Sequence, residues 1–202
     1  MIGIGAILLV GACGESPPES QYIDEAPSSE APGAETPAAS TSEPATDSRV
    51  IAGVNFAIDP SWQEAQPASS MRAAQFSVGE GDQAAEIVVF HFGPGQGGSV
   101  DDNLVRWARL VLDENDQPTI PEVVEFEQNG LKTTVATFEG DYLAGPPGGQ
   151  KSRMTDWTLI AAVIERGPQG SLFPRLVGPS DAVNAARPAF EAFVRSAQPT
   201  TP

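Results

Sequence analysis

The sequence predicts an α+β fold in which helices pack on an antiparallel β-sheet of about six to seven strands. Three observations support this prediction. Short segments of alternating or apolar residues are bounded by Gly, Pro and Asp, an Asn-Gly pair stands between two alternating runs, and two segments carry apolar residues at helical spacing. Their order along the chain is strands, helix, hairpin, strands, helix, which differs from the regular strand-helix alternation of a parallel fold.

Three early segments have strand character: 54–59, 71–78 and 85–92. In the first, Val54 and Phe56 alternate with smaller or polar residues, as in a strand with one buried face. In the third, the residues on both faces are apolar, which predicts a strand that is covered on both sides. We therefore expect the third segment to be a central strand.

The most regular helical pattern covers 99–114, where Ser99 or one of the aspartates after it can cap the first turn. The apolar residues that recur at helical spacing in this segment are Leu104, Trp107, Ala108 and Val111. A second helical pattern covers 180–198. Its Pro188 predicts either a kink or the first turn of a second helical segment.

Asn129 and Gly130 separate two alternating runs and predict a β-hairpin. Both positions of such a two-residue turn need a positive φ, which Asn and Gly adopt most readily. Further along the chain, 156–166 has the pattern of a long buried strand and 171–179 that of a short one. Because Pro174 in the short strand has no N–H donor, we expect that strand at a sheet edge or at a bulge.

Two short motifs lie near the ends of the part expected to fold. They are FAIDPSW at 56–62 and LFPRLVGP at 172–179, the latter followed by a helical segment with Phe190, Phe193 and Ser196. Both resemble the opening and closing segments of PsbP-like and Mog-like α/β/α sandwich proteins. The resemblance implies such a sandwich. It implies no shared catalytic site, because members of these families serve as assembly factors, extrinsic subunits and protein-binding modules.

The chain starts with an apolar run, 2–12, which has the length of the hydrophobic region of a signal peptide and is too short to span a bilayer. The run ends in VGAC at 10–13, which resembles the lipobox of bacterial lipoproteins. That resemblance implies a signal peptide at 1–12 and lipidation of Cys13, with palmitate among the attached groups. No Lys or Arg precedes the run, and a start codon further upstream would supply the basic residues that a signal usually has.

Cys13 is the only cysteine of the chain, and it has two other interpretations. A free thiol in a small apolar segment is one, but the hydrophobic pattern does not continue after Cys13. A catalytic thiol is the other, but no basic residue lies nearby to stabilise a thiolate. We therefore expect a bacterial cell-envelope protein that is held at the lipid bilayer by acylated Cys13, with its domain on the extracytoplasmic side.

Residues 13–48 are predicted to be the lipidated cysteine and a disordered acidic tether. Segment 14–48 has eight acidic residues, no Lys or Arg, and too few apolar residues to offset the entropy cost of ordering. The next segment, 49–198, has the usual size of a single domain. Residues 199–202 are expected to be a disordered tail.

The chain is acidic, with a formal net charge of -16 at pH 7. Binding to nucleic acid requires clustered Lys and Arg that neutralise phosphates, so no nucleic acid partner is expected. A single cysteine also excludes intramolecular disulfides, so the domain must be stabilised by its core.

Three motifs are reminiscent of known sites but match them poorly. The Gly-rich segment 92–103 lies between a strand and a helix, yet it has no Lys or Arg in its loop and matches no phosphate-loop pattern. His91 has no serine elbow as a partner, so we expect a core or rim histidine. The acidic cluster 113–117 matches a calcium loop only in part. No metal and no cofactor are therefore expected.

A binding surface, if the domain has one, is expected where loops and a helix stand on the rigid sheet. The candidate residues are Gly95, Gly97, Gly98, Arg106 and Arg109. Arg106 and Arg109 either pair with carboxylates of the sheet or form a small recognition patch in an acidic domain, and the loop 144–150 is a further candidate.

Two functions remain open. The first is a membrane-anchored envelope lipoprotein that acts as a non-catalytic protein-binding or assembly module, with an unidentified envelope protein as its partner. The second is a carboxylate- or metal-dependent hydrolase of the cell envelope that uses Asp101, Asp102 and Asp156. The lipobox resemblance, the acidic spacer and the lack of a catalytic motif favour the first, so we assign no catalytic residue.

Overall fold

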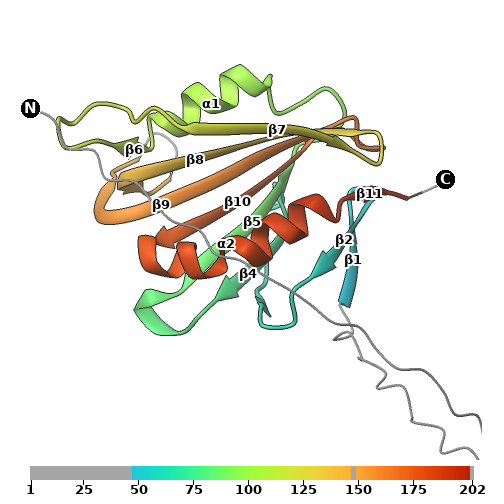
Figure 1. The fold of residues 1–202 in the computed structure, drawn as a ribbon, viewed down its shortest axis with the longest axis horizontal. Helices are drawn as coiled ribbons and strands as arrows, with labels where there is room; N and C mark the ends of the chain where they lie inside the picture. Colours follow the sequence, from blue (N-terminus) through green and yellow to red (C-terminus); the bar gives the residue numbers. More distant parts are fainter. Residues whose placement is uncertain (1–46, 147–148, 201–202) are drawn as a thin grey trace, which may run out of the picture. The chain divides into compact units, whose positions relative to one another are not determined.

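The computed structural model describes residues 47–146 and 149–200, and the lipobox and nearly all of the expected tether lie outside them. Strands dominate this part of the chain, and two helices accompany them (Figure 1). The elements are β1 (Asp47–Ile51), β2 (Val54–Ile58), β3 (Gln63–Glu64), β4 (Arg72–Val78), a 3₁₀ turn (Gly81–Gln83), β5 (Ala85–His91), α1 (Val100–Ala108), β6 (Val111–Leu112), β7 (Glu122–Gln128), β8 (Leu131–Ala144), β9 (Ser152–Glu165), β10 (Leu172–Pro179), α2 (Ser180–Arg195) and β11 (Gln198–Pro199).

The strands form two sheets, and every pairing recorded within the described residues is antiparallel. The large sheet has eight strands in the order β3-β4-β5-β10-β9-β8-β6, with β7 also paired to β8. The small sheet has three strands, β1-β2-β11. The predicted α+β class with an antiparallel sheet is confirmed. The predicted number of strands is too low, because β3, β6 and β11 are two-residue strands that carry no periodic pattern and because β1, which begins within the expected tether, is not among the predicted strands.

The large sheet is covered on both faces, and side-chain alternation decides which residues face which layer. On β9, Ile160, Ala162 and Ile164 belong to the core under α2 and the small sheet, whereas Leu159 and Ala161 belong to the core under α1. Figure 1 shows α1 and α2 on opposite sides of the sheet. In a strand that is buried on both faces, apolar residues therefore do not alternate with polar ones. The prediction for 85–92 used the same reasoning.

The first helix is shorter than its periodicity predicts. α1 ends at Ala108, and Val111 belongs to β6, which pairs with Tyr142 of β8. The Leu110 carbonyl accepts a hydrogen bond of 2.8 Å from the Leu143 N–H. The sheet thus satisfies backbone groups that a longer helix would have satisfied. The predicted cap is confirmed, because Ser99 and Asp102 form a reciprocal capping box.

Two prolines lie in regular elements. Pro188 is inside α2, which runs from Ser180 to Arg195 as one helix, so the alternative of two segments is wrong. Pro174 lies in β10, between β5 and β9, so the expectation of an edge strand is wrong as well. Pro174 is in register with Val89 of β5, and the recorded pairing with β9 passes directly from Leu172 to Arg175. The missing N–H is therefore accommodated by a local gap in one ladder.

The predicted hairpin is confirmed. Asn129 and Gly130 have φ values of 53° and 78° and connect β7 to β8. The Asn129 side chain also donates a hydrogen bond of 2.9 Å to the Ala197 carbonyl, which joins the turn to the segment after α2. Neither helix of the described residues has the length and apolar character needed to cross a bilayer.

Candidate functional site

A large groove opens on the face of the sheet that α1 covers in part, and its volume is ≈ 1100 Å³. Its floor comes from β4, β5, β8, β9 and β10, and one wall is formed by α1. Loop residues at both ends of the strands complete the rim, and they include Met71, Phe92 and Lys151. Ligand sites are usually concave and lined mainly by apolar and aromatic side chains, with a few polar groups. The groove has this composition.

Aromatic side chains line the groove in two stacked pairs. Tyr142 and Trp157 have ring centroids 5.7 Å apart with an interplanar angle of 8°. Phe90 and Phe92 have centroids 6.2 Å apart with an angle of 9°. Phe92 also contacts Phe173 at a tilt, with a centroid distance of 5.4 Å. These rings offer flat apolar surfaces on which a planar or apolar group can pack.

The charged residues of the groove are mostly cations. Among the described residues that line it, the cations are Arg72, Arg106, Arg109, Lys151 and Arg175, and the single carboxylate is Glu86. This contrasts with the chain as a whole, which has 11 Lys and Arg against 27 Asp and Glu. The groove is therefore a local positive region in an acidic protein.

Glu86 offsets only part of the positive charge of the groove, because its carboxylate is already bound by Arg72 and Gln75. Its Oε1 accepts a hydrogen bond of 2.9 Å from Arg72 and one of 2.8 Å from Gln75. Arg72 also donates to Gln75 at 3.0 Å, so these three side chains form a closed group on β4 and β5. Glu86 thus forms an ion pair with Arg72, and the other four cations of the groove form no ion pair within the described residues.

Arg175 lies at the centre of the groove floor, on β10. Its guanidinium carbon is 4.8 Å from the centroid of the Phe90 ring, which is a cation–π contact. Its Nε is buried and has no hydrogen-bond partner among the described residues. Burial lowers the pKa of Arg175, and nearby Tyr142 and Glu86 oppose this shift. An arginine side chain nevertheless keeps its charge in proteins, so Arg175 is a partly desolvated cation with an unused donor.

Two further cations are held in place by their own neighbours. Arg106 donates a hydrogen bond of 3.2 Å to the Asn103 side chain, whose Nδ2 donates in turn to the Gly97 carbonyl at 2.9 Å. Lys151 donates to the Gly145 carbonyl at 2.8 Å, which ties the two sides of the loop between β8 and β9 together. These bonds use one donor of each cation and leave further donors for a ligand.

The structure brings together some of the residues predicted for a binding surface. Arg106 and Arg109 line the groove on the α1 side. Gly97 lies behind it, since a Cβ added there would come within 2.4 Å of the Phe173 ring, and one added at Gly98 would lie 3.3 Å from an Arg106 nitrogen. Gly95 is further away, with no atom within 4 Å of an added Cβ. Of the loop 144–150, the described residues Ala144, Gly145 and Pro146 line the groove.

Sequence reasoning missed Arg175, although the sequence contains a signal for it. On one face of β10, Phe173, Arg175 and Val177 follow each other at alternate positions, so a single cation stands between two core residues. Such a cation is unexpected on a buried strand, because charged side chains are rarely buried without a partner. That anomaly is the sequence feature that marks the site.

The other motifs lie away from the groove. His91 is partly exposed, and its Nε2 is 2.9 Å from the Gln169 carbonyl oxygen. The carboxylate of Asp113 accepts backbone hydrogen bonds of 2.8 Å from Asn115 and Gln117, and these bonds lower the pKa of Asp113. The cluster 113–117 is thus a turn that is closed by its own side chain. Within the described residues, no group of three or more His, Cys, Asp and Glu could hold a metal ion.

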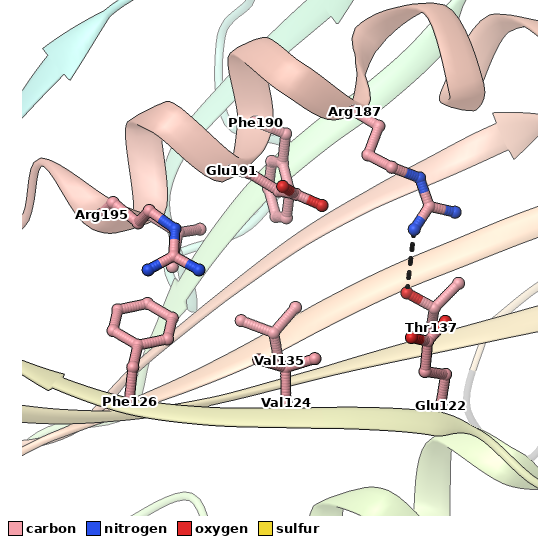
Figure 2. Close-up of a pocket in the computed structure, with 10 residues that line it drawn as sticks. Glu122, Val124, Phe126, Val135, Thr137, Arg187, Phe190, Glu191 and Arg195 are labelled. Carbon is pink, nitrogen blue, oxygen red and sulfur yellow. Dashed lines mark hydrogen bonds between the residues drawn. The ribbon is translucent and has the colours of Figure 1, made fainter. Parts of the chain in front are cut away.

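A second, smaller cavity of ≈ 120 Å³ lies on the opposite face of the sheet, between α2 and strands β7 and β8 (Figure 2). Its two cations are already engaged: Arg195 lies 4.2 Å over the Phe126 ring, and Arg187 is 3.4 Å from Thr137 Oγ1. Glu122 and Glu191 line the same cavity and balance the charge. Because ligand sites usually exceed about 300 Å³ and are lined mainly by apolar side chains, we regard the larger groove as the candidate site.

The chain matches no protein-family model and no curated protein. Solved structures that are similar to it include the following two. The solution structure of cyanobacterial PsbP from Synechocystis has 14% sequence identity and a TM-score of 0.45, over 73% of this chain and 86% of that one. A protein of unknown function from Pseudomonas aeruginosa has 14% identity and a TM-score of 0.40, over 78% of this chain and 99% of that one. We assign no function from these likenesses.

Proposed function

We propose that the protein is a lipid-anchored lipoprotein of the bacterial cell envelope whose domain is a non-catalytic binding or assembly module with a PsbP-like or Mog-like sandwich fold. The observation that carries the binding part is the groove, where four cations that form no ion pair within the described residues lie beside two stacked aromatic pairs. The anchoring part is supported by the lipobox resemblance of 10–13, which lies outside the described residues. Acylated Cys13 would hold the chain at the bilayer, and the domain would recognise a protein or another envelope component at the groove.

The chemistry of the groove favours binding over catalysis. General acid-base catalysis needs a group that can exchange a proton, such as a histidine or a carboxylate of suitable pKa. Among the described residues of the groove, the one carboxylate is Glu86, and both Arg72 and Gln75 bind it. Arginines and the rings of Phe and Trp orient and hold a ligand but do not transfer protons, and of the two other titratable side chains Tyr142 lies beside Arg175 and Lys151 is bound to the Gly145 carbonyl. Recognition is therefore the task that these side chains can perform.

The hydrolase alternative depends on Asp101, Asp102 and Asp156, and none of these residues lines the groove. Asp102 is engaged in the capping box of α1, where hydrogen bonds from the side chain and the backbone of Ser99 lower its pKa. Asp156 lies on β9, and its backbone N–H points to the Asp141 carboxylate at 3.4 Å. We therefore propose the binding module and not the hydrolase.

The binding proposal is tested by crosslinking in cells. A photoreactive amino acid at Met71, which lines the groove and is 51% exposed, should give a discrete adduct in the envelope fraction. The matched control is Val50, which is 59% exposed and lies on β1, outside the groove. Adducts that form equally from both positions, or from neither, would contradict the proposal.

The anchoring proposal is tested by mass spectrometry of the mature protein in the membrane fraction. The expected N-terminal residue is Cys13 carrying acyl groups. The variant Cys13→Ser should keep the segment 1–12 and carry no lipid. A wild-type chain that retains this segment and has an unmodified Cys13 would refute the lipid anchor.

A further inference from the structure

We propose that the groove binds an organic anion, with its single carboxylate, phosphate or sulfonate group on Arg175 and its flat apolar body between the aromatic side chains. This inference deepens the proposed function and rests on it in one respect, namely that recognition takes place in the groove. It names the chemical group that is recognised.

The charge of the groove selects an anion. Five cations line it, and only Arg72 among them forms an ion pair within the described residues, with Glu86 at 2.9 Å. Elsewhere in the described residues, cations are commonly paired: Arg153 with Asp141 at 2.6 Å and Arg166 with Glu127 at 2.9 Å are examples. A cationic ligand would be repelled from the groove, whereas an anion would gain charge-assisted hydrogen bonds there.

Arg175 is the residue that places the anionic group. Its buried Nε has no acceptor among the described residues, and the nearest carboxylate system, Glu86, is occupied by Arg72 and Gln75. An anion in the groove does not reach the buried Nε itself, but Arg175 as a whole is only partly buried, and the charge of the anion would offset the cost of holding a partly desolvated cation there. The guanidinium can also donate two parallel hydrogen bonds to one carboxylate or phosphate.

The surroundings of Arg175 select a flat apolar body. Phe90 lies under its guanidinium on one side and stacks with Phe92. Tyr142 also lies close to Arg175 and stacks with Trp157. Both aromatic pairs line the same groove as Arg175, so a ligand whose anionic group is at Arg175 has aromatic rings beside its body, and flat apolar groups pack best against such rings.

The size of the groove excludes an inorganic ion as the natural occupant. Its volume of ≈ 1100 Å³ is far larger than one phosphate or sulfate needs, and most of its surface is apolar. Small anions gain nothing from that apolar surface, whereas a ligand with an apolar body does. We therefore expect free phosphate to compete only weakly.

The test uses two fluorescent probes of the same shape and different charge. One is 1-anilinonaphthalene-8-sulfonate, an anion with an aromatic body, and the other is N-phenyl-1-naphthylamine, its uncharged analogue. The wild-type protein should bind one anionic probe per chain and bind it more tightly than the neutral probe. In Arg175→Met the affinity for the anionic probe should fall at least about tenfold, while that for the neutral probe stays within about twofold.

Arg187→Met is the matched control, because Arg187 is a partly exposed cation on the opposite face of the sheet. Its removal should leave both affinities unchanged. A second variant, Arg109→Gln, changes an exposed rim residue and does not threaten the fold. This variant should lower the affinity for the anionic probe by about two- to fivefold and leave the affinity for the neutral probe unchanged. Inorganic phosphate should displace the anionic probe only at a concentration at least about a hundred times the dissociation constant of the probe.

The inference is overturned if Arg175→Met and Arg109→Gln both keep the wild-type affinity for the anionic probe, or if the charged and the neutral probe bind equally. Efficient displacement by phosphate alone would overturn the part that concerns the apolar body. Failure here is distinct from failure of the proposed function. If Met71 gives a crosslink but Arg175→Met binds the anionic probe as tightly as the wild type, the proposed binding module stands. Only the proposal that its ligand is an anion is then rejected.

Discussion

The guanidinium of Arg175 stands over the ring of Phe90, 4.8 Å from its centroid, and its Nε donates to no acceptor among the described residues. The contact with the ring contributes about 0.5–2 kcal/mol, and the unsatisfied donor costs about 1–3 kcal/mol. The two effects nearly cancel, so Arg175 is not explained by a gain in stability. A charged side chain that adds no net stability to the fold is the kind of residue found at functional sites.

Arg175→Met should therefore change the free energy of unfolding by less than about 1 kcal/mol, in either direction. The measurement is urea unfolding at neutral pH. Phe173→Ala, which empties a buried position two residues away on the same strand, serves as the comparison and should cost about 3–5 kcal/mol. A loss in Arg175→Met as large as that of Phe173→Ala would show that Arg175 is structural.

Gly97→Ala should destabilise the wall of the groove. Gly97 has a φ of 97°, and an added Cβ would lie 2.4 Å from the Phe173 ring. Gly95 has a φ of 69° with no atom within 4 Å of such a Cβ, so Gly95→Ala measures the backbone strain alone. We expect Gly95→Ala to lower the free energy of unfolding by about 1 kcal/mol and Gly97→Ala to lower it by about 1–3 kcal/mol more. Equal losses of unfolding free energy in urea would contradict the contact with Phe173.

Asn129 should stabilise the protein in two separable ways. Its φ of 53° fits the hairpin turn, and its side chain bonds the Ala197 carbonyl at 2.9 Å. Asn129→Gly keeps the turn geometry and loses the hydrogen bond, so it should cost about 1 kcal/mol. Asn129→Ala loses both and should cost about 1–2 kcal/mol more. Thermal unfolding of the two variants beside the wild type measures the difference, and a glycine variant as unstable as the alanine variant would contradict this division.

The stability of α1 should depend on pH through Asp102. Hydrogen bonds from the side chain and backbone of Ser99 lower the pKa of Asp102 in the folded protein. The contribution of ionised Asp102 to the free energy of unfolding is therefore fully present above the pKa of the unfolded state, about 3.9. It is lost as the pH falls through the lower pKa of the folded state. Asp102→Asn should be less stable than the wild type at pH 7, and the difference should shrink towards pH 2 when urea unfolding is compared at both. Ser99→Ala should show the same pH dependence, and a difference that is constant with pH would exclude this role.

Much of the fold follows from local patterns in the sequence. The hairpin at Asn129 and Gly130, the cap at Ser99 and the strand character of β5 need only turn chemistry and side-chain periodicity, and the structure has all three. The end of α1 does not follow in this way. Val111 fits the helical period, but pairing of β6 with β8 takes precedence, and that pairing joins residues far apart in the chain.

The candidate site follows from the sequence only in part. Arg106 and Arg109 flank Trp107 on α1, so their place beside the sheet could be predicted from the helical period. Arg175 could not be placed, because Pro174 indicates an edge strand, and an edge would expose Arg175 to water. In the structure β10 is an interior strand and Arg175 is partly buried. No local pattern specifies the strand order. Because that order places β10 between β5 and β9, Arg175 lies in the floor of the groove and not at an exposed edge.

The three tryptophans allow the most direct test of the central claim that ligands bind in the groove. Trp107 and Trp157 line the groove, whereas Trp62 lies in the core on the other face of the sheet. In a titration with 1-anilinonaphthalene-8-sulfonate, the indole N–H resonances of Trp107 and Trp157 should shift together along one saturation curve, while that of Trp62 stays in place. A shift of the Trp62 resonance without the other two, or no shift of any, would contradict the claim.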